Sequence, residues 1–469
     1  MMTAENTSPV PGQNAGIHMV YLYLIVLVAA VGGFLFGYDL SLISGAIIFL
    51  KAEFALNPFW MGAVVGSAIL GCPFGPLVGV WMADAIGRKP TLILASVLFM
   101  ASALGCSLAG GMTAFIVWRF VGGMGVGLAS TVSPMYIAEV APAHLRGRLV
   151  VVNQLAIVIG LSMSVLVTYW LSFGGHWRVM FATQVIPVFC LMAGLFFVPE
   201  SPRWLAARSK LQQALDVLAK ISGRLRAEKE MEEIRTELGE ETGGLAELFR
   251  PGIRRALVIG LLLMVFSQIN GVNMILLYTP TLFLEAGLTS APDAILNSVY
   301  IDAWITLCTM IAFWLTRTFG RRAILIGGTL AMAAGHALMF LNFTWHLPSV
   351  FALAAMLVPT GAFTLTLAPL SWVVLSEIFP NRVRGKAMSI ATCAMFASSY
   401  ITVNVFPVVL DYFKKTFGHP GGTFLIFAGI CLACTLFVWR MLPETKDKTL
   451  EEIGRFWLKL ERAAEAEQG

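Results

Sequence analysis

Charged side chains are scarce in this chain of 469 residues, because only 13% of its residues are Asp, Glu, Lys or Arg. A soluble domain is about a quarter charged, so this chain has too few charges to cover a surface in water. Hydrophobic residues make up 58% of the sequence, and the mean hydropathy is +0.79. The composition excludes an ordinary soluble protein and indicates one that is embedded in a lipid bilayer.

Reactive and metal-binding side chains are also few and scattered. The seven cysteines all fall within apolar runs, as small buried hydrophobic residues do. Cys431 and Cys434 have CxxC spacing, but no second ligand pair accompanies them. The sequence has no Gly-rich phosphate loop, nucleophile elbow or cluster of metal ligands, and its six histidines are spread along the chain. It therefore predicts a protein that is not an enzyme and that binds neither a metal nor a cofactor.

Twelve apolar runs are long enough to cross a bilayer, which takes about 20 residues of helix. The expected spans are 20–49, 59–83, 91–110, 113–137, 149–172, 177–198, 254–284, 294–316, 323–343, 349–375, 386–411 and 422–442. The expected fold is therefore an all-α polytopic membrane protein. An even number of spans places both termini on the same side of the membrane.

Many of the Lys and Arg residues behind the net charge of +5 lie in the short loops between these spans, so the charge needs no nucleic-acid partner to explain it. One set of loops carries ten basic residues and the other set four, so the first set and both termini are expected in the cytoplasm. Residues 1–18 are polar without a basic cluster, which predicts a disordered tail rather than a cleaved signal. The first apolar run, from Met19 to about Leu50, is too long for a signal peptide.

One long polar stretch divides the chain. Residues 199–253 are rich in charge, and Leu211, Leu215 and Leu218 recur at helical spacing, so short amphipathic helices are expected there. The predicted organisation is a first six-helix bundle at 19–198, a cytoplasmic helical linker at 199–253, a second bundle at 254–443 and a cytoplasmic tail at 444–469.

An internal repeat supports this division. Three motifs of the first half recur in the same order in the second: Gly87-Arg88-Lys89 as Gly320-Arg321-Arg322, Glu139 with Arg146 as Glu377 with Arg384, and Pro199-Glu200-Ser201 as Pro443-Glu444-Thr445. The offsets are nearly constant, at 320 − 87 = 233, 377 − 139 = 238 and 443 − 199 = 244 residues. Parallel repeats of six helices are typical of one large class of secondary transporters.

An ordered set of motifs resembles the sugar porters of the major facilitator superfamily, from residue 20 to about 455. The motifs are Gly37-Tyr38-Asp39, the stretch from Gly79 to Lys89, Arg119-Phe120-Val121-Gly122-Gly123, Tyr136-Ile137-Ala138-Glu139, Arg146-Gly147-Arg148, the stretch from Pro199 to Leu205, Gln268 with Asn273, Trp372 and Pro443-Glu444-Thr445. Within the family, the chain is most similar to the bacterial proton-coupled pentose and hexose symporters. The resemblance implies the major facilitator fold, a bacterial inner membrane and a monomer.

Two charges lie inside apolar spans, where each needs a partner or an aqueous cavity. Asp39 and Arg119 both fall on the extracellular side of the expected midplane, so a salt bridge between them is feasible. A fixed ion pair that only packs two helices is one interpretation. The other is proton coupling, because protonation of Asp39 releases Arg119 and ionisation restores the pair. The resemblance favours coupling, since proton-linked members have Asp at this position and facilitative uniporters have Asn.

Amides and aromatic rings are the side chains that suit a sugar, because amides offer both donors and acceptors to its hydroxyl groups. The resemblance assigns substrate contacts to five positions: Gln154, Gln268, Asn273, Trp372 and Phe396. It makes Tyr278 a candidate outer gate. A lone amide can equally serve as a hydrogen bond between helices.

The chain departs from the family at several of these positions. Ser267-Gln268 and Leu277-Tyr278 stand where adjacent glutamines and adjacent tyrosines are common, and Met395 and Ile305 replace polar residues. These changes predict a more apolar pocket and leave room for a less hydroxylated substrate. Asp302 has no family counterpart. It can be a carboxylate solvated in the vestibule, a second proton site or a site for a cationic substrate.

Charged residues at the cytoplasmic ends of the helices predict a latch, that is, a network of ion pairs that holds the inner side shut. Each pair alone is worth little at a surface, but a symmetric set offers the two-state element that transport needs. The latch residues are Asp84, Arg88, Glu139, Arg146, Arg321, Arg322, Glu377 and Arg384. Arg317 stands where an acid corresponding to Asp84 is expected, which weakens the predicted second latch.

The sequence therefore predicts a secondary active transporter that imports a pentose or hexose with protons by alternating access. A symporter or facilitator of a less hydroxylated solute, such as a polyol, is the alternative. A transporter-like nutrient sensor is a third interpretation, but such sensors usually have long cytoplasmic extensions. The expected partners are a sugar and the lipid bilayer, and the proton is the coupling ion.

Overall fold

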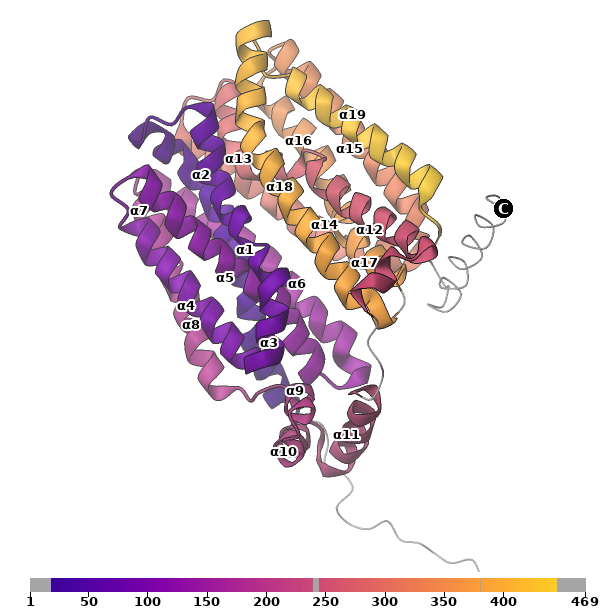
Figure 1. Ribbon diagram of the computed structural model, residues 1–469. Helices are drawn as coiled ribbons and strands as arrows, with labels where there is room; N and C mark the ends of the chain where they lie inside the picture. The colour runs from indigo at the N-terminus through magenta and orange to yellow at the C-terminus, as the bar shows by residue number, and fades with distance from the viewer. Residues whose placement is uncertain (1–17, 239–243, 380, 445–469) are drawn as a thin grey trace, which may run out of the picture.

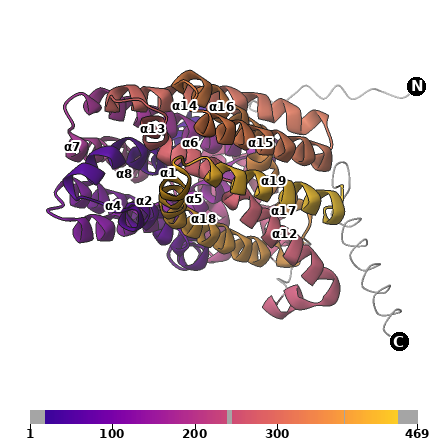
Figure 2. The ribbon, with the colours of Figure 1, turned by 90° about the horizontal axis from the view of Figure 1, so that it is seen from above.

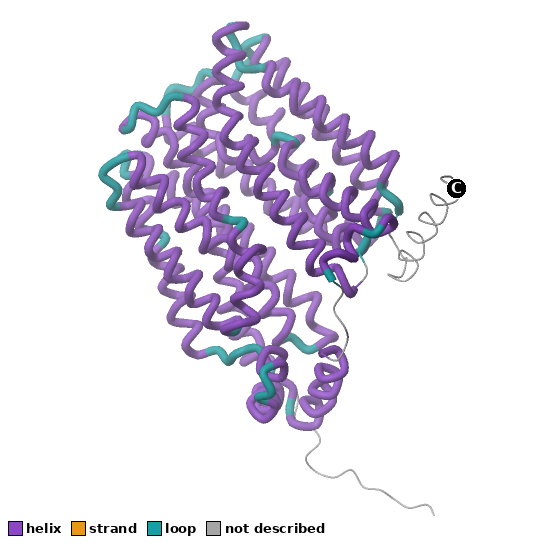
Figure 3. Tube along the Cα trace, in the orientation of Figure 1, coloured by secondary structure: helices purple, strands orange, loops and turns teal. Residues whose placement is uncertain are grey.

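The computed structural model describes residues 18–238, 244–379 and 381–444, and the expected terminal tails lie almost wholly outside these ranges. Every regular element in the described residues is a helix, as Figure 3 shows. Helices satisfy all backbone hydrogen bonds within one segment, and this is what a chain without water around it requires.

The first half of the chain is helical almost throughout. Its helices are α1 (Met19–Glu53), α2 (Pro58–Gly71), η1 (Gly75–Gly79), α3 (Val80–Ile86), α4 (Arg88–Ser107), α5 (Met112–Val140), α6 (Ala143–Ser172), α7 (Trp177–Ala182) and α8 (Val185–Phe197). Helices α9 (Pro202–Ala207), α10 (Leu211–Ser222) and α11 (Arg224–Leu238) and the 3₁₀ turn η2 (Leu245–Phe249) follow in the linker.

The second half repeats the pattern. Its helices are α12 (Pro251–Ile269), α13 (Val272–Glu285), α14 (Ala291–Thr318), α15 (Arg321–Thr344), α16 (Ser349–Leu365), α17 (Leu367–Glu377), α18 (Asn381–Phe417) and α19 (Gly422–Met441). Together the described residues contain twelve segments long and apolar enough to cross a membrane, which confirms the twelve predicted spans. The chain is a multi-pass membrane protein.

Four spans are interrupted in ways that the sequence analysis did not predict: the second between α2 and α3, the sixth between α7 and α8, and also the seventh and the tenth. The seventh span breaks between α12 and α13 at Gly271, whose φ of +90° is a left-handed conformation that favours glycine. The tenth span breaks at Thr366, between α16 and α17. Broken helices free backbone groups at membrane depth, which is where secondary transporters bind their substrates.

The two bundles lie side by side, with the first half in indigo to magenta and the second in pink to yellow (Figures 1 and 2). Helices α9, α10 and α11 project from one end of the molecule, which we call the linker side, and the opposite end is the far side. Helix α1 begins at the linker side, because the His18 amide donates to the Ile221 carbonyl of α10 at 2.9 Å.

The described contacts between the halves lie at mid-depth or toward the far side. Gly62, near the far-side start of α2, packs so closely on α18 that a Cβ there would lie 2.3 Å from the Asn404 carbonyl oxygen. Deep in the far half, Ser44 of α1 donates to the Leu276 carbonyl of α13 at 3.0 Å. The Ser162 and Thr306 hydroxyls of α6 and α14 are 3.1 Å apart. The halves are therefore joined on the far side.

Candidate functional site

A buried polar cluster lies inside the first bundle. Asp39 of α1 accepts from Arg119 Nη1 of α5 at 2.9 Å, and the exposed fraction of each residue is 0%. Arg119 Nη2 also reaches the Asp39 backbone carbonyl at 3.4 Å, and the guanidinium lies 5.7 Å from the centroid of the Phe181 ring. The ion pair that the sequence made feasible is therefore formed.

A third member of the cluster was missed by the sequence analysis. Gln184, at the junction of α7 and α8, donates Nε2 to Asp39 Oδ1 at 3.0 Å and is fully buried. It is a lone amide in an apolar span, as Gln154 and Gln268 are, but unlike them it was not among the positions that the family resemblance assigned. One oxygen of Asp39 thus accepts two donors from two other spans.

The cluster leaves some hydrogen-bonding capacity unused. Asp39 Oδ2 and Gln184 Oε1 are buried and have no hydrogen-bond partner among the described residues. Removing one partner of a buried ion pair leaves an uncompensated charge, at a cost of about 3–5 kcal/mol. Protonation of Asp39 at the unused Oδ2 is a different route, because it neutralises the carboxylate while Oδ1 can still accept.

The amides of span seven meet at its break. Asn273 Nδ2 donates to Gln268 Oε1 at 2.7 Å, and both side chains are partly exposed. They are two of the five predicted substrate contacts, and they remain within reach of a solute. Gln268 Nε2 has only a long contact of 3.3 Å to Ser267 Oγ, so it retains the capacity to bind a hydroxyl group.

Asn270 is structural, in contrast to its neighbours. Its Nδ2 donates to the Phe266 and Ser267 carbonyls, and its Oδ1 accepts from the Val272 amide, so it replaces hydrogen bonds that the break removes. His336 of α15 binds the freed Asn270 carbonyl at 2.8 Å. The break is thereby held in place by the outer helices of the second bundle.

The other predicted contacts lie apart from this amide pair. Gln154 on α6 is exposed, Trp372 on α17 is 41% exposed, and Phe396 on α18 is buried. No described hydrogen bond joins any of them to Gln268 or Asn273. Tyr278 is fully buried, donates to the Val403 carbonyl at 3.1 Å and packs on Phe406, so it ties α13 to α18.

The repeated motifs converge at the linker side of the first bundle. Arg88 at the start of α4 binds Glu139 of α5 at 2.8 Å and Asp84 at 3.0 Å. Glu200 accepts from the backbone amides of Arg88 at 3.0 Å, Lys89 at 3.2 Å and Ser201 at 2.8 Å. Burial raises the pKa of Glu200, and these three amide donors oppose that rise.

The second bundle has the same construction. Arg321 at the start of α15 binds Glu377 at 3.1 Å, and Glu444 accepts from the amides of Arg321 at 2.9 Å and Arg322 at 3.2 Å. Glu200 and Glu444 were recognised in the sequence as repeat markers, but not as members of the latch. A carboxylate at the start of a helix suits the unpaired N–H groups and the positive end of the helix dipole.

The described ion pairs of the predicted latch each lie within one half. Arg146 and Arg384, which follow these clusters in each half, have a buried Nε without a described partner, and Arg384 Nη2 contacts the Phe379 carbonyl at 3.3 Å. The Arg322 guanidinium contacts the Trp439 carbonyl. The side chain of Arg317 lies outside the described residues, so its predicted effect on the second latch stays a prediction.

Asp302 is not solvated in this structure. It is 8% exposed in the far half of α14, and its Oδ2 has no hydrogen-bond partner among the residues that the structure describes. The expectation of a carboxylate solvated in a vestibule is therefore wrong for this conformation.

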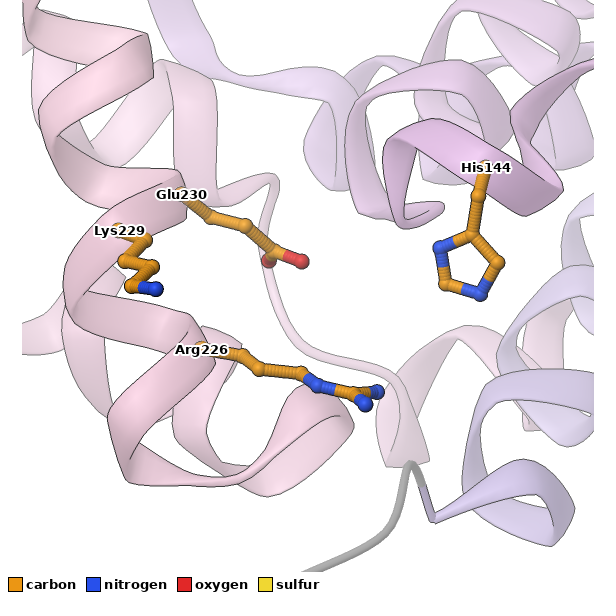
Figure 4. A pocket seen from close by; sticks show the side chains of 4 residues that line it. All are labelled: His144, Arg226, Lys229 and Glu230. Atoms are coloured by element: carbon orange, nitrogen blue, oxygen red, sulfur yellow. The ribbon is translucent and has the colours of Figure 1, made fainter.

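A pocket of about 380 Å³ lies at the linker side, and it shares Glu230 with a smaller pocket that Glu139 and Arg146 of the predicted latch line. As Figure 4 shows, His144 of α6 faces Arg226, Lys229 and Glu230 of α11 across it. Burial raises the pKa of Glu230, and a hydrogen bond from Ser222 opposes the rise. None of the predicted substrate contacts lines this pocket.

Comparisons with known proteins agree along nearly the whole chain. Residues 25–457 match the family described as "Sugar (and other) transporter". The chain is 37% identical to the D-xylose-proton symporter of Escherichia coli, over 95% of this chain and 97% of that protein. It is 36% identical to the arabinose-proton symporter of Bacillus subtilis, over 94% and 96% of the two chains.

Solved structures give the same result. The inward-open conformation of the Escherichia coli xylose transporter matches with a TM-score of 0.82 at 35% identity, covering 93% of this chain and all of that one. The proton:xylose symporter bound to 6-bromo-6-deoxy-D-glucose matches with a TM-score of 0.75 at 36% identity, covering 94% and 99%.

Proposed function

The chain belongs to the sugar transporter family of the major facilitator superfamily, and we propose that it imports a pentose or hexose together with protons by alternating access. The observation that carries this proposal is the buried pair of Asp39 and Arg119 beside Gln184. A fully buried carboxylate with a spare oxygen and a single cationic partner is suited to exchange a proton as its surroundings open and close. The family consists of transporters and not of enzymes, and symport needs no cofactor besides the proton.

In this proposal, the proton and the conformation are linked through Asp39. Ionised Asp39 forms an ion pair with Arg119. Protonation of Asp39 weakens this interaction, while α1, α5 and the α7–α8 junction stay packed. Protonation from outside then permits the halves to close over the sugar, and loss of the proton inside restores the pair. A ligand shifts such an equilibrium only by its different affinity for the two states, and here the ligand is the proton.

We propose that the sugar binds between the halves at the break in span seven. Gln268 and Asn273 supply the amide groups, and Gln154, Trp372 and Phe396 approach from the other helices when the halves close. Tyr278 stays the candidate outer gate, and it would act through its hydrogen bond to the Val403 carbonyl of α18. Met395 and Phe396 are both buried and apolar, so the amides carry most of the hydroxyl recognition.

The linker side is the cytoplasmic side in this proposal, as the excess of basic residues in its loops supports. The protein would then lie in a bacterial inner membrane with both termini in the cytoplasm. One chain carries both halves of the binding site, so a monomer suffices. The ion pairs Arg88–Glu139 and Arg321–Glu377 lie at this side, one in each half. In this proposal, charged residues of the two sets form ion pairs with one another when the cytoplasmic side closes.

Uptake by proteoliposomes tests the proposed function. The purified protein is reconstituted and offered labelled pentoses, hexoses and polyols, with and without an inward proton gradient. Accumulation of one sugar above its external concentration is expected only with the gradient, and a protonophore should abolish it. Equilibration that ignores the gradient would show a facilitator instead, and accumulation of polyols alone would refute the sugar assignment.

A further inference from the structure

We propose that Asp302 is a second proton-binding site, which must take up a proton whenever the far side of the transporter closes. The proposal rests on the proposed function for its place in a transport cycle, but its observations and its test do not involve the sugar. Asp302 is more than nine-tenths buried, and one of its carboxylate oxygens has no hydrogen-bond partner.

The position of Asp302 is set by a polar stripe on α14. Ser298, Asp302 and Thr306 are spaced four residues apart, so successive members lie about 40° apart on one side of the helix. Thr306 donates to the Asp302 backbone carbonyl at 2.8 Å and meets Ser162 of the other half at 3.1 Å. Asp302 thus lies one turn from a direct contact between the two halves.

Ser298, one turn before Asp302 in this stripe, also has an unpaired side-chain oxygen among the described residues. The hydroxyl of Ser298 is buried and has no hydrogen-bond partner, like Oδ2 of Asp302 one turn away. Ser298 therefore does not donate to the carboxylate of Asp302 in this conformation. A protonated carboxyl group carries a donor of its own, which an ionised one lacks.

None of the ion pairs among the described residues involves Asp302. The helices packed on α14 are α6, α13 and α16. The titratable residues that they and α14 carry are His144, Arg146, Arg148 and Tyr169 of α6, Tyr278 and Glu285 of α13, and Asp293, Tyr300, Cys308 and Arg317 of α14 itself, while α16 has none.

The basic residues in this set are far from Asp302. His144, Arg146 and Arg148 lie in the first turns of α6 at the linker side, and Arg317 is fifteen residues along α14, or about 22 Å away by helical rise. Glu285 is paired with Lys414 at 2.6 Å, and Tyr278 donates to a backbone carbonyl. An isolated buried carboxylate is so unfavourable that such groups take up a proton instead.

The contact between α6 and α14 makes this protonation conditional. When the far side opens, the Ser162–Thr306 contact separates, and Asp302 gains access to water and ionises. Closing the far side then requires one proton per molecule. The ratio of far-side-open to far-side-closed molecules should rise by up to about tenfold for each pH unit between the titration range of the open state and that of the closed state, and it should level off above the latter.

The test uses the full chain in lipid nanodiscs without sugar. Spin labels are placed on exposed far-side positions of the two halves, as Phe59→Cys and Phe417→Cys, in a Cys190→Ser background because Cys190 is exposed. Distances between the labels are measured as the pH rises from 5 to 9. Infrared spectra of the same samples follow the C=O band of protonated carboxyl groups.

The variants are Asp302→Asn, Asp302→Leu as a second permanently neutral side chain, and Asp293→Asn as an exposed carboxyl on the same helix. We expect wild type and Asp293→Asn to open with rising pH and to lose one carboxyl band as they do so. Both Asp302 variants should lack that band and the corresponding slope of about one proton. Retention of the band or of the full slope in both Asp302 variants would overturn the proposal. A failure of sugar accumulation would instead count against the proposed function alone.

Discussion

Replacing Gln184 by Leu tests whether the cluster around Asp39 sets the pH range of transport. Gln184 supplies one of the two donors to Asp39 Oδ1, at 3.0 Å, and the whole contact is buried. A hydrogen bond contributes about 1.5–3 kcal/mol when its acceptor is charged and about 0.5–1.5 kcal/mol when it is neutral, so this bond favours the ionised form of Asp39 by about 1–1.5 kcal/mol. Arg119 still pairs with Asp39 in the variant, so neither buried charge loses its partner and the protein should fold.

The sign of the effect follows from which form loses stabilisation. Without Gln184 the ionised carboxylate loses more stabilisation than the protonated one does, so the deprotonation step of each transport cycle is disfavoured. At 1.36 kcal/mol per pH unit, a difference of about 1–1.5 kcal/mol should move the midpoint of the pH profile of active uptake up by about one unit.

The assay is the initial rate of proton-driven uptake in proteoliposomes, measured over internal pH at a fixed gradient. Asn342→Leu, which removes a buried amide from α15, is the matched control and should leave the midpoint in place. A Gln184→Leu protein that is well folded and has an unchanged midpoint would refute the role assigned to this cluster.

Three further predictions concern stability and substrate binding. Arg119→Ala should lower the free energy of unfolding by about 3–5 kcal/mol, because it leaves Asp39 buried without its cation, and the added substitution Asp39→Asn should recover most of the loss in thermal unfolding. Burial raises the pKa of Glu200, so its contribution is complete below its unfolded value and is lost as the pH rises through the folded value. The Tm of Glu200→Gln relative to wild type should therefore increase between pH 4 and pH 7, and a constant difference would exclude the burial effect. Asn273→Ala should raise the KM for the sugar by about fivefold to tenfold, which corresponds to the free energy of one neutral hydrogen bond. An unchanged KM would show that Asn273 does not contact the sugar.

The twelve spans were predictable because a bilayer leaves a long apolar segment no other structure than a helix. The repeat was equally readable, since Arg88 with Glu139 and Arg321 with Glu377 form matching pairs in the two halves. In both cases local sequence decides the outcome, either through hydropathy or through duplication.

The site itself was only partly predictable. Asp39 and Arg119 are visible as charges in apolar spans, but the contact of Gln184 with Asp39 joins residues 145 apart and depends on how three spans pack. The roles of Glu200 and Glu444 depend on the path of the chain after spans six and twelve, which brings each back to the start of another helix. The burial of Asp302 depends on the conformation of the whole molecule, which hydropathy does not encode.

Coupling through Asp39 is the central claim, and one comparison tests it most directly. Wild type and Asp39→Asn are reconstituted in parallel, and sugar accumulation under a proton gradient is measured together with counterflow exchange without one. The account predicts that Asp39→Asn loses accumulation above the external concentration but retains exchange, because the amide oxygen can still accept from Arg119 and Gln184 while the titrating group is gone. The uncompensated charge of Arg119 lowers stability, so both activities are compared per amount of folded protein. Accumulation by Asp39→Asn at the wild-type level would contradict it.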